Sequence, residues 1–165
     1  MSHPILLYDG VCGLCNWLVR FILQRDPGAV FRFASLQSAL AADILGRHGA
    51  DSRDLDTVYV VVDHERPDEL LLARSNAVIF VLKQLGSTAG LRPEGQPGAA
   101  VPTQATPAMA GLTLWRFAGF LLQLVPQSVR DWAYGMVARN RYRIFGRYDS
   151  CPLPSEETRS RFLDL

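Results

Sequence analysis

The stretch Pro4-Ile5-Leu6-Leu7-Tyr8-Asp9-Gly10-Val11-Cys12-Gly13-Leu14-Cys15 decides the fold expected for this chain. Its short apolar run, residues 5–8, predicts a buried strand. From residue 14 to residue 23, apolar side chains recur at helical spacing. The sequence therefore predicts a Cys-x-x-Cys pair where a strand passes into a helix, a position typical of redox dithiols.

Strand and helix patterns alternate along most of the chain. They predict a single α/β domain over residues 1–165, with a mixed sheet flanked by helices. Ser75 is the expected N-cap of one helix. The other expected strands are 29–34, 57–63 and 69–74, the last two as a hairpin, and the other expected helices are 37–48, 112–125 and 128 to about 141.

Two parts of the chain lie outside this alternation. Residues 87–110 are rich in proline, glycine and alanine, which predicts a mobile low-complexity insertion, either a tolerated linker or a docking loop. Residues 112–165 are expected to form a helical extension after the α/β part.

Composition narrows the classes of protein. A formal net charge of +1 gives no reason to expect nucleic acid as a partner. Three cysteines are too few for the disulfide framework of a secreted domain. The N-terminus lacks the pattern of a signal peptide. The longest apolar segment, 112–125, is too short to cross a bilayer, which needs about 20 apolar residues. We therefore expect a cytoplasmic protein without a transmembrane segment.

The cysteine spacing predicts a division of labour. Unpaired N–H groups at a helix N-terminus stabilise an anion, so Cys12 is the expected thiolate and nucleophile. Cys12 is expected at the exposed end of the helix. Cys15, one turn further in, is expected to be more buried and to act as the resolving thiol.

Asp9 has two interpretations. In one, its carboxylate lies behind Cys15 and accepts the proton that the resolving thiol releases. In the other, it accepts N–H groups of its own loop as an Asx turn. A carboxylate close to Cys12 would also raise the pKa of that thiol.

A non-enzymatic zinc- or partner-binding module is the alternative hypothesis. It would use Cys12, Cys15 and Cys151, because zinc normally takes four ligands. The fourth ligand would be one of three histidines that have no paired spacing: His3, His48 and His64.

The Asp9-x-x-Cys12-x-x-Cys15 arrangement resembles the signature of the DCC family of thiol-disulfide oxidoreductases. A second block, which includes residues 138–147 and Cys151-Pro152-Leu153-Pro154, resembles the C-terminal part of that family. The resemblance implies a thioredoxin-like fold, Cys12 and Cys15 as the redox pair, and Asp9 as the third signature residue. Ordinary thioredoxins carry a cis-proline before the hairpin; here Asp56-Thr57-Val58 occupies that place.

The C-terminal block carries arginines four residues apart: Arg139, Arg143 and Arg147. If the helix continues, they form one basic stripe, either a solvated face or a binding site for a carboxylate of the substrate. Expected partners are a disulfide-containing protein or a small thiol such as glutathione. No metal and no cofactor are expected, and Cys151 is expected to be non-catalytic.

Overall fold

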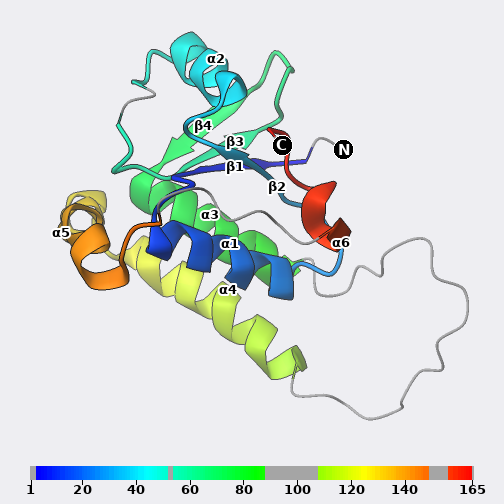
Figure 1. Cartoon of the computed structure of the whole chain (residues 1–165). Helices are drawn as coiled ribbons and strands as arrows, with labels where there is room; N and C mark the ends of the chain where they lie inside the picture. The colour runs from blue at the N-terminus through cyan, green and yellow to red at the C-terminus, as the bar shows by residue number, and fades with distance from the viewer. Residues whose placement is uncertain (1–2, 52–53, 88–107, 149–155, 165) are drawn as a thin grey trace, which may run out of the picture.

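A mixed four-stranded sheet forms the centre of the protein (Figure 1). The computed structural model describes residues 3–51, 54–87, 108–148 and 156–164. The strands are β1 (Ile5–Tyr8), β2 (Arg32–Ser35), β3 (Tyr59–Val62) and β4 (Leu70–Ala73), in the order β2-β1-β3-β4. β1 is parallel to β2 and antiparallel to β3, and β3 and β4 form the predicted hairpin.

Helices cover both faces of this sheet. α2 (Ala39–Arg47) lies on one face, and α1 (Gly13–Arg25) and α3 (Arg74–Ser87) lie on the other (Figure 1). The C-terminal extension adds α4 (Ala108–Leu124), which packs along α3, and α5 (Gln127–Phe145), which contacts both α1 and α3. A one-turn helix, α6 (Glu156–Arg159), follows. This is a thioredoxin-like α/β arrangement with added helices, as predicted.

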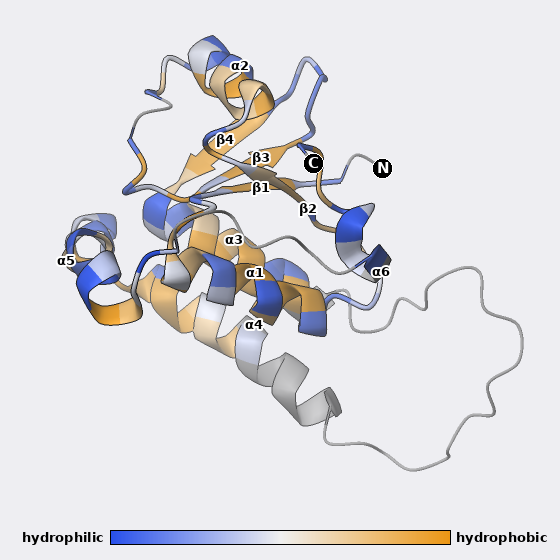
Figure 2. Ribbon diagram, viewed as in Figure 1, coloured by the Kyte–Doolittle hydropathy of each residue, from blue (hydrophilic) through white to orange (hydrophobic). Residues whose placement is uncertain are grey.

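Alternation along β1 divides the core into two apolar clusters. Leu6 and Tyr8 pack with residues of α1 and α3, whereas Ile5 and Leu7 pack with residues of α2. Side chains alternate across a strand, so a fully apolar strand must be covered on both faces. Figure 2 shows the resulting hydrophobic strands between the helical layers. The end of β1 is therefore held rigidly just before the two cysteines.

Two boundaries differ from the prediction. Ser75 is not an N-cap, because α3 already begins at Arg74, and its hydroxyl instead bonds the Asp131 carboxylate of α5 at 2.5 Å. The expected insertion at 87–110 is shorter at both ends: Ser87 is the last residue of α3, and 108–110 belong to α4. Residues 88–107 and Cys151 lie outside the described residues.

The last described segment fastens onto β2. Phe162 forms a parallel bridge with Phe33, whose N–H donates to the Arg161 carbonyl. The Arg161 guanidinium makes a buried ion pair with Asp26, at the end of α1. Asp26 also accepts the N–H groups of Val30 and Phe31, at 3.1 and 2.9 Å. This pair ties the C-terminal segment to the turn between α1 and β2.

None of the described helices is long and apolar enough to span a bilayer.

Replacing Arg161 with methionine should lower the free energy of unfolding by about 3–5 kcal/mol, since the Asp26 carboxylate would stay buried without its cation. Urea denaturation measures the change. Arg159→Met, two residues away at an exposed position, is the matched control and should shift stability by less than about 0.5 kcal/mol. Equal stability of the two variants would contradict a role for the ion pair.

Candidate active site

The two cysteines lie where the sequence predicts, at the start of α1. Cys12 is the N-cap residue with extended backbone angles, and its Sγ accepts the Cys15 N–H at 3.5 Å. The helix continues at once, because the Cys12 carbonyl accepts the Asn16 N–H at 3.0 Å. Both cysteines are free thiols. The thiolate of an N-cap cysteine therefore meets the unpaired N–H groups of the first helical turn.

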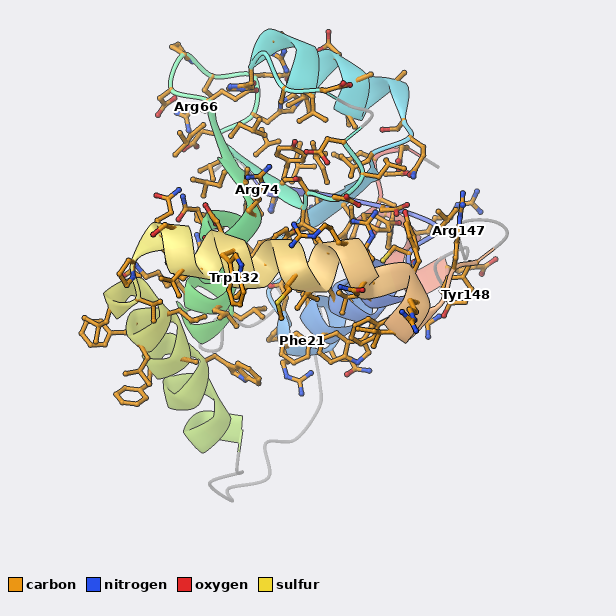
Figure 3. All side chains as sticks on the ribbon, turned by 90° about the vertical axis from the view of Figure 1, so that its left-hand side faces the viewer. Phe21, Arg66, Arg74, Trp132, Arg147 and Tyr148 are labelled. Atoms are coloured by element: carbon orange, nitrogen blue, oxygen red, sulfur yellow. The ribbon has the colours of Figure 1, made fainter. Side chains whose placement is uncertain are left out.

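Cys12 is not at an exposed end, so that part of the prediction is wrong. Its exposed fraction is 0%, and that of Cys15 is 3%. The segment after α5 covers Cys12, since Arg147 forms an antiparallel bridge with it. The Gly13 N–H donates to the Gly146 carbonyl at 3.2 Å, and the Tyr148 N–H donates to the Val11 carbonyl at 2.8 Å. Figure 3 shows Arg147 and Tyr148 beyond the end of α5.

Gly13 makes this close cover feasible. A Cβ at Gly13 would lie 2.1 Å from the Phe145 carbonyl oxygen, far inside any normal contact. Glycine is used where two backbones approach closely. The glycine between the cysteines thus lets the C-terminal segment lie against the dithiol.

The two thiols have opposite pKa shifts. A hydrogen bond from the Cys15 thiol, N–H groups of the first turn and the charge of Arg141 together lower the pKa of Cys12 to about 6, against desolvation by burial. The hydrogen bond to Cys12, together with burial, strongly raises the pKa of Cys15. At neutral pH the site therefore holds a Cys12 thiolate beside a protonated Cys15.

Asp9 is fully buried at the centre of a polar network. Its Oδ1 accepts the Val11 N–H at 3.1 Å and the Gln37 side-chain amide at 2.8 Å. Its Oδ2 accepts an Arg141 N–H at 3.1 Å and the Tyr142 hydroxyl at 2.5 Å. The Val11 contact is the Asx turn of the second interpretation. Because both oxygens have partners, the carboxylate holds the loop and Arg141 in place.

Sequence reasoning missed Arg141, whose positive charge acts on both thiols. Its side chain is 3% exposed and pairs with Asp9, while a second guanidinium nitrogen lies 3.4 Å from Asp56. Tyr134, Ala138 and Arg141 share one face of α5 by their spacing, and this is the signal that points Arg141 inward. Two further missed residues, Asn16 and Gln37, bond backbone groups of Gly10.

The predicted basic stripe is broken. α5 ends at Phe145, and Gly146 turns the chain away with φ 77, so Arg147 lies outside the helix. Arg139 and Arg143 are exposed. The guanidinium carbon of Arg147 lies 5.6 Å from the centre of the Tyr142 ring. Substrate binding by these three arginines stays a prediction.

Metal ligation finds little support in the described residues. No group of three potential ligands is found there. His48 and His64 both bond the Glu69 carboxylate at 2.8 Å, and His3 lies 2.8 Å from the Val30 carbonyl. Zinc binding that involves Cys151 stays a prediction, because that residue lies outside the described part of the chain.

Asp56-Thr57-Val58, at the place of the thioredoxin cis-proline, have ordinary trans peptide bonds. The described peptide bonds include no cis bond. The Val58 N–H donates to the Tyr134 hydroxyl at 2.8 Å, and the Val58 carbonyl accepts the Arg74 N–H at 3.1 Å. Both backbone groups of Val58 are therefore already occupied, one of them by α5.

Replacing Cys15 with alanine should raise the pKa of Cys12 from about 6, because the hydrogen bond from Cys15 is its largest lowering influence. The thiolate's ultraviolet absorbance against pH reports the value without requiring access to the sulfur. All variants carry Cys151→Ser, and Cys12→Ser identifies the Cys12 signal. An unchanged titration in Cys15→Ala would contradict this pairing of the thiols.

Replacing Gly13 with alanine should displace the covering segment and speed the labelling of Cys12 by N-ethylmaleimide. An overpacking strain of about 1–3 kcal/mol raises the population of an opened segment by a factor of roughly 5 to 150. Gly46→Ala in α2, where a new Cβ meets nothing within 4 Å, is the control. Mass spectrometry of the labelled peptide gives the rate, and equal rates would show that this contact does not limit access.

Comparisons with known proteins place the chain in a family. The model of the DCC1-like thiol-disulfide oxidoreductase family matches residues 6–93. The chain is 32% identical to the uncharacterized protein YuxK of Bacillus subtilis over 163 residues, covering 99% of this chain and 96% of that protein. It is 35% identical to the chloroplastic DCC family protein At1g52590 of Arabidopsis thaliana over 152 residues, covering 92% and 70%. No solved structure matches. The chain belongs to the DCC family of thiol-disulfide oxidoreductases.

Proposed function

We propose that this protein exchanges disulfides through Cys12 as nucleophile and Cys15 as resolving thiol. The observation that carries the proposal is the pair of opposite pKa shifts: Cys12 is lowered to about 6, and Cys15 is raised. A nucleophilic thiol needs to be a thiolate near neutral pH, and a resolving thiol keeps its proton until it is needed.

The reaction is a two-electron transfer in two steps. The Cys12 thiolate attacks one sulfur of a substrate disulfide, a bond forms between them, and the other substrate sulfur leaves as a thiolate that takes up a proton. Cys15 then releases its proton and attacks the Cys12 sulfur, which expels the second substrate thiol. The substrate ends as two thiols, and the protein ends with a Cys12–Cys15 disulfide. An external thiol such as glutathione, or a dithiol protein, reduces that disulfide again.

The buried polar network supports this chemistry indirectly. The positive charge of Arg141 lowers the pKa of both thiols, while the negative charge of Asp9 is offset by its bond to Arg141. In this proposal Asp9 is a positioning residue rather than a proton acceptor. Arg139, Arg143 and Arg147 would serve only to attract an anionic substrate along the exposed side of the C-terminal block.

Access to Cys12 requires a local opening. The nucleophile is fully buried beneath Gly146 and Arg147, so a protein disulfide reaches it only when that segment moves. We place this reaction in a reducing compartment, the cytoplasm, where a dithiol is kept reduced. The Arabidopsis relative is named as chloroplastic, and that name concerns the relative alone.

Three cysteine variants test the proposal. Cys12→Ser should reduce insulin or glutathione disulfide no faster than buffer, because no thiolate remains to attack. Cys15→Ser should accumulate a mixed disulfide with the substrate, visible by mass spectrometry, because the resolving step is missing. Cys151→Ser should retain wild-type activity.

A zinc role would give the opposite pattern. Release of one zinc ion per chain by a chelator, dependent on Cys151, together with disulfide reduction that is unaffected by Cys12→Ser, would refute the exchange mechanism.

A further inference from the structure

An apolar cavity of about 360 Å³ adjoins Cys15 of the dithiol. Leu14 and Leu18 of α1, Val78 of α3 and Ala138 of α5 form its walls. Cys15 also lines it, whereas Cys12 does not. The cavity exists because α5 lies across α1 and α3, so the added C-terminal helices build it rather than the sheet.

A buried cation also borders this cavity. Arg141 lines it, and the Nε–H of that buried guanidinium has no hydrogen-bond partner among the described residues. A buried donor without a partner costs about 1–3 kcal/mol. Tyr134 offers no charge here, because burial raises its pKa to about 12. The cavity thus combines apolar walls with a thiol and the buried Arg141 guanidinium group at its border.

The opening of the cavity is also apolar. Trp17 and Val137 line it while remaining 58% and 45% exposed, so they stand at its entrance. Trp132, on the outer side of α5, is a further exposed apolar side chain on this helix (Figure 3). Contiguous apolar surface around a cavity is typical of a site for another protein or peptide.

Resting on the proposed exchange reaction, we infer that this cavity seats an apolar side chain next to the cysteine of a peptide or protein substrate. The occupant touches Cys15, and Cys15 is hydrogen-bonded to the Cys12 thiolate. The disulfide of the substrate, next to this apolar side chain, is thereby brought beside both thiols. Glutathione, with two carboxylates and an ammonium group, lacks the apolar group that this cavity fits.

Two synthetic peptides test the inference. They differ only in the residue after the cysteine, leucine or serine, and each is a mixed disulfide with a chromogenic aryl thiol. Single-turnover reaction with the reduced full chain gives the rate constants. Burying a leucine side chain is worth about 1.5–3 kcal/mol, so we expect the leucine peptide to react roughly tenfold faster or more.

Val137→Gln places a polar side chain at the cavity entrance and should bring this ratio toward one. Met136→Gln, the adjacent exposed residue outside the cavity lining, is the matched control and should keep the ratio. Circular dichroism verifies that both variants are folded. Equal rate constants for the two peptides in the wild type would overturn the inference, and so would an equal effect of the two variants on their ratio. Either result would leave the exchange reaction standing.

Binding separates failure of the pocket from failure of the reaction. Fluorescent versions of both peptides, with serine in place of cysteine, are titrated with the Cys12→Ser chain and followed by polarisation. Tighter binding of the leucine peptide, lost in Val137→Gln, supports the pocket even if no peptide disulfide is reduced. Equal binding overturns it. The inference is also overturned if Val137→Gln, but not Met136→Gln, abolishes a dimer or vesicle binding, because the occupant would then be a second copy or a lipid.

Discussion

The buried ion pair between Asp9 and Arg141 is the interaction on which the site depends. Asp9 directly follows the last residue of β1, and Arg141 lies 132 residues later in α5. Taking two charges out of water is costly, and such a pair is tolerated only when further hydrogen bonds satisfy it. Val11, Gln37 and Tyr142 supply those bonds to Asp9. Helix α5 is thereby bound to the loop that precedes both cysteines.

This fastening sets the electrostatics of the dithiol. A carboxylate this close to Cys12 would alone raise the pKa of the thiol. The hydrogen bond from Cys15 is the largest influence that lowers the pKa of Cys12, and the charge of Arg141 lowers it further. The signature aspartate therefore lies beside a low-pKa nucleophile together with its ion-pair partner Arg141, whose charge contributes to the lowered pKa of Cys12. The acidic residue of the motif and the basic C-terminal block act as one unit.

Local patterns predicted the parts of the fold that local forces determine. The apolar run at residues 5–8 and the helical spacing after Cys12 both appear as predicted, because strand burial and helix amphipathicity are written in neighbouring residues. The exposure of Cys12 was predicted wrongly, since a helix N-terminus reveals nothing about what covers it. The residues that cover Cys12 are Gly146 and Arg147, far from it in the sequence. The helical spacing of Arg141 likewise indicates a buried position near the thiols only when the position of α5 is known.

The cover can open without disturbing the ion pair. Gly146 keeps its N–H bonded to the Tyr142 carbonyl, so α5 and Arg141 stay in place when the chain beyond moves. Two backbone hydrogen bonds, from Gly13 and Tyr148, hold the segment to the cysteine loop. Each contributes only about 0.5–1.5 kcal/mol net, because water replaces the lost partner. Separating Asp9 from Arg141 would instead leave an uncompensated buried charge, at about 3–5 kcal/mol. Breaking the two hydrogen bonds that cover Cys12 therefore costs less than separating Asp9 from Arg141.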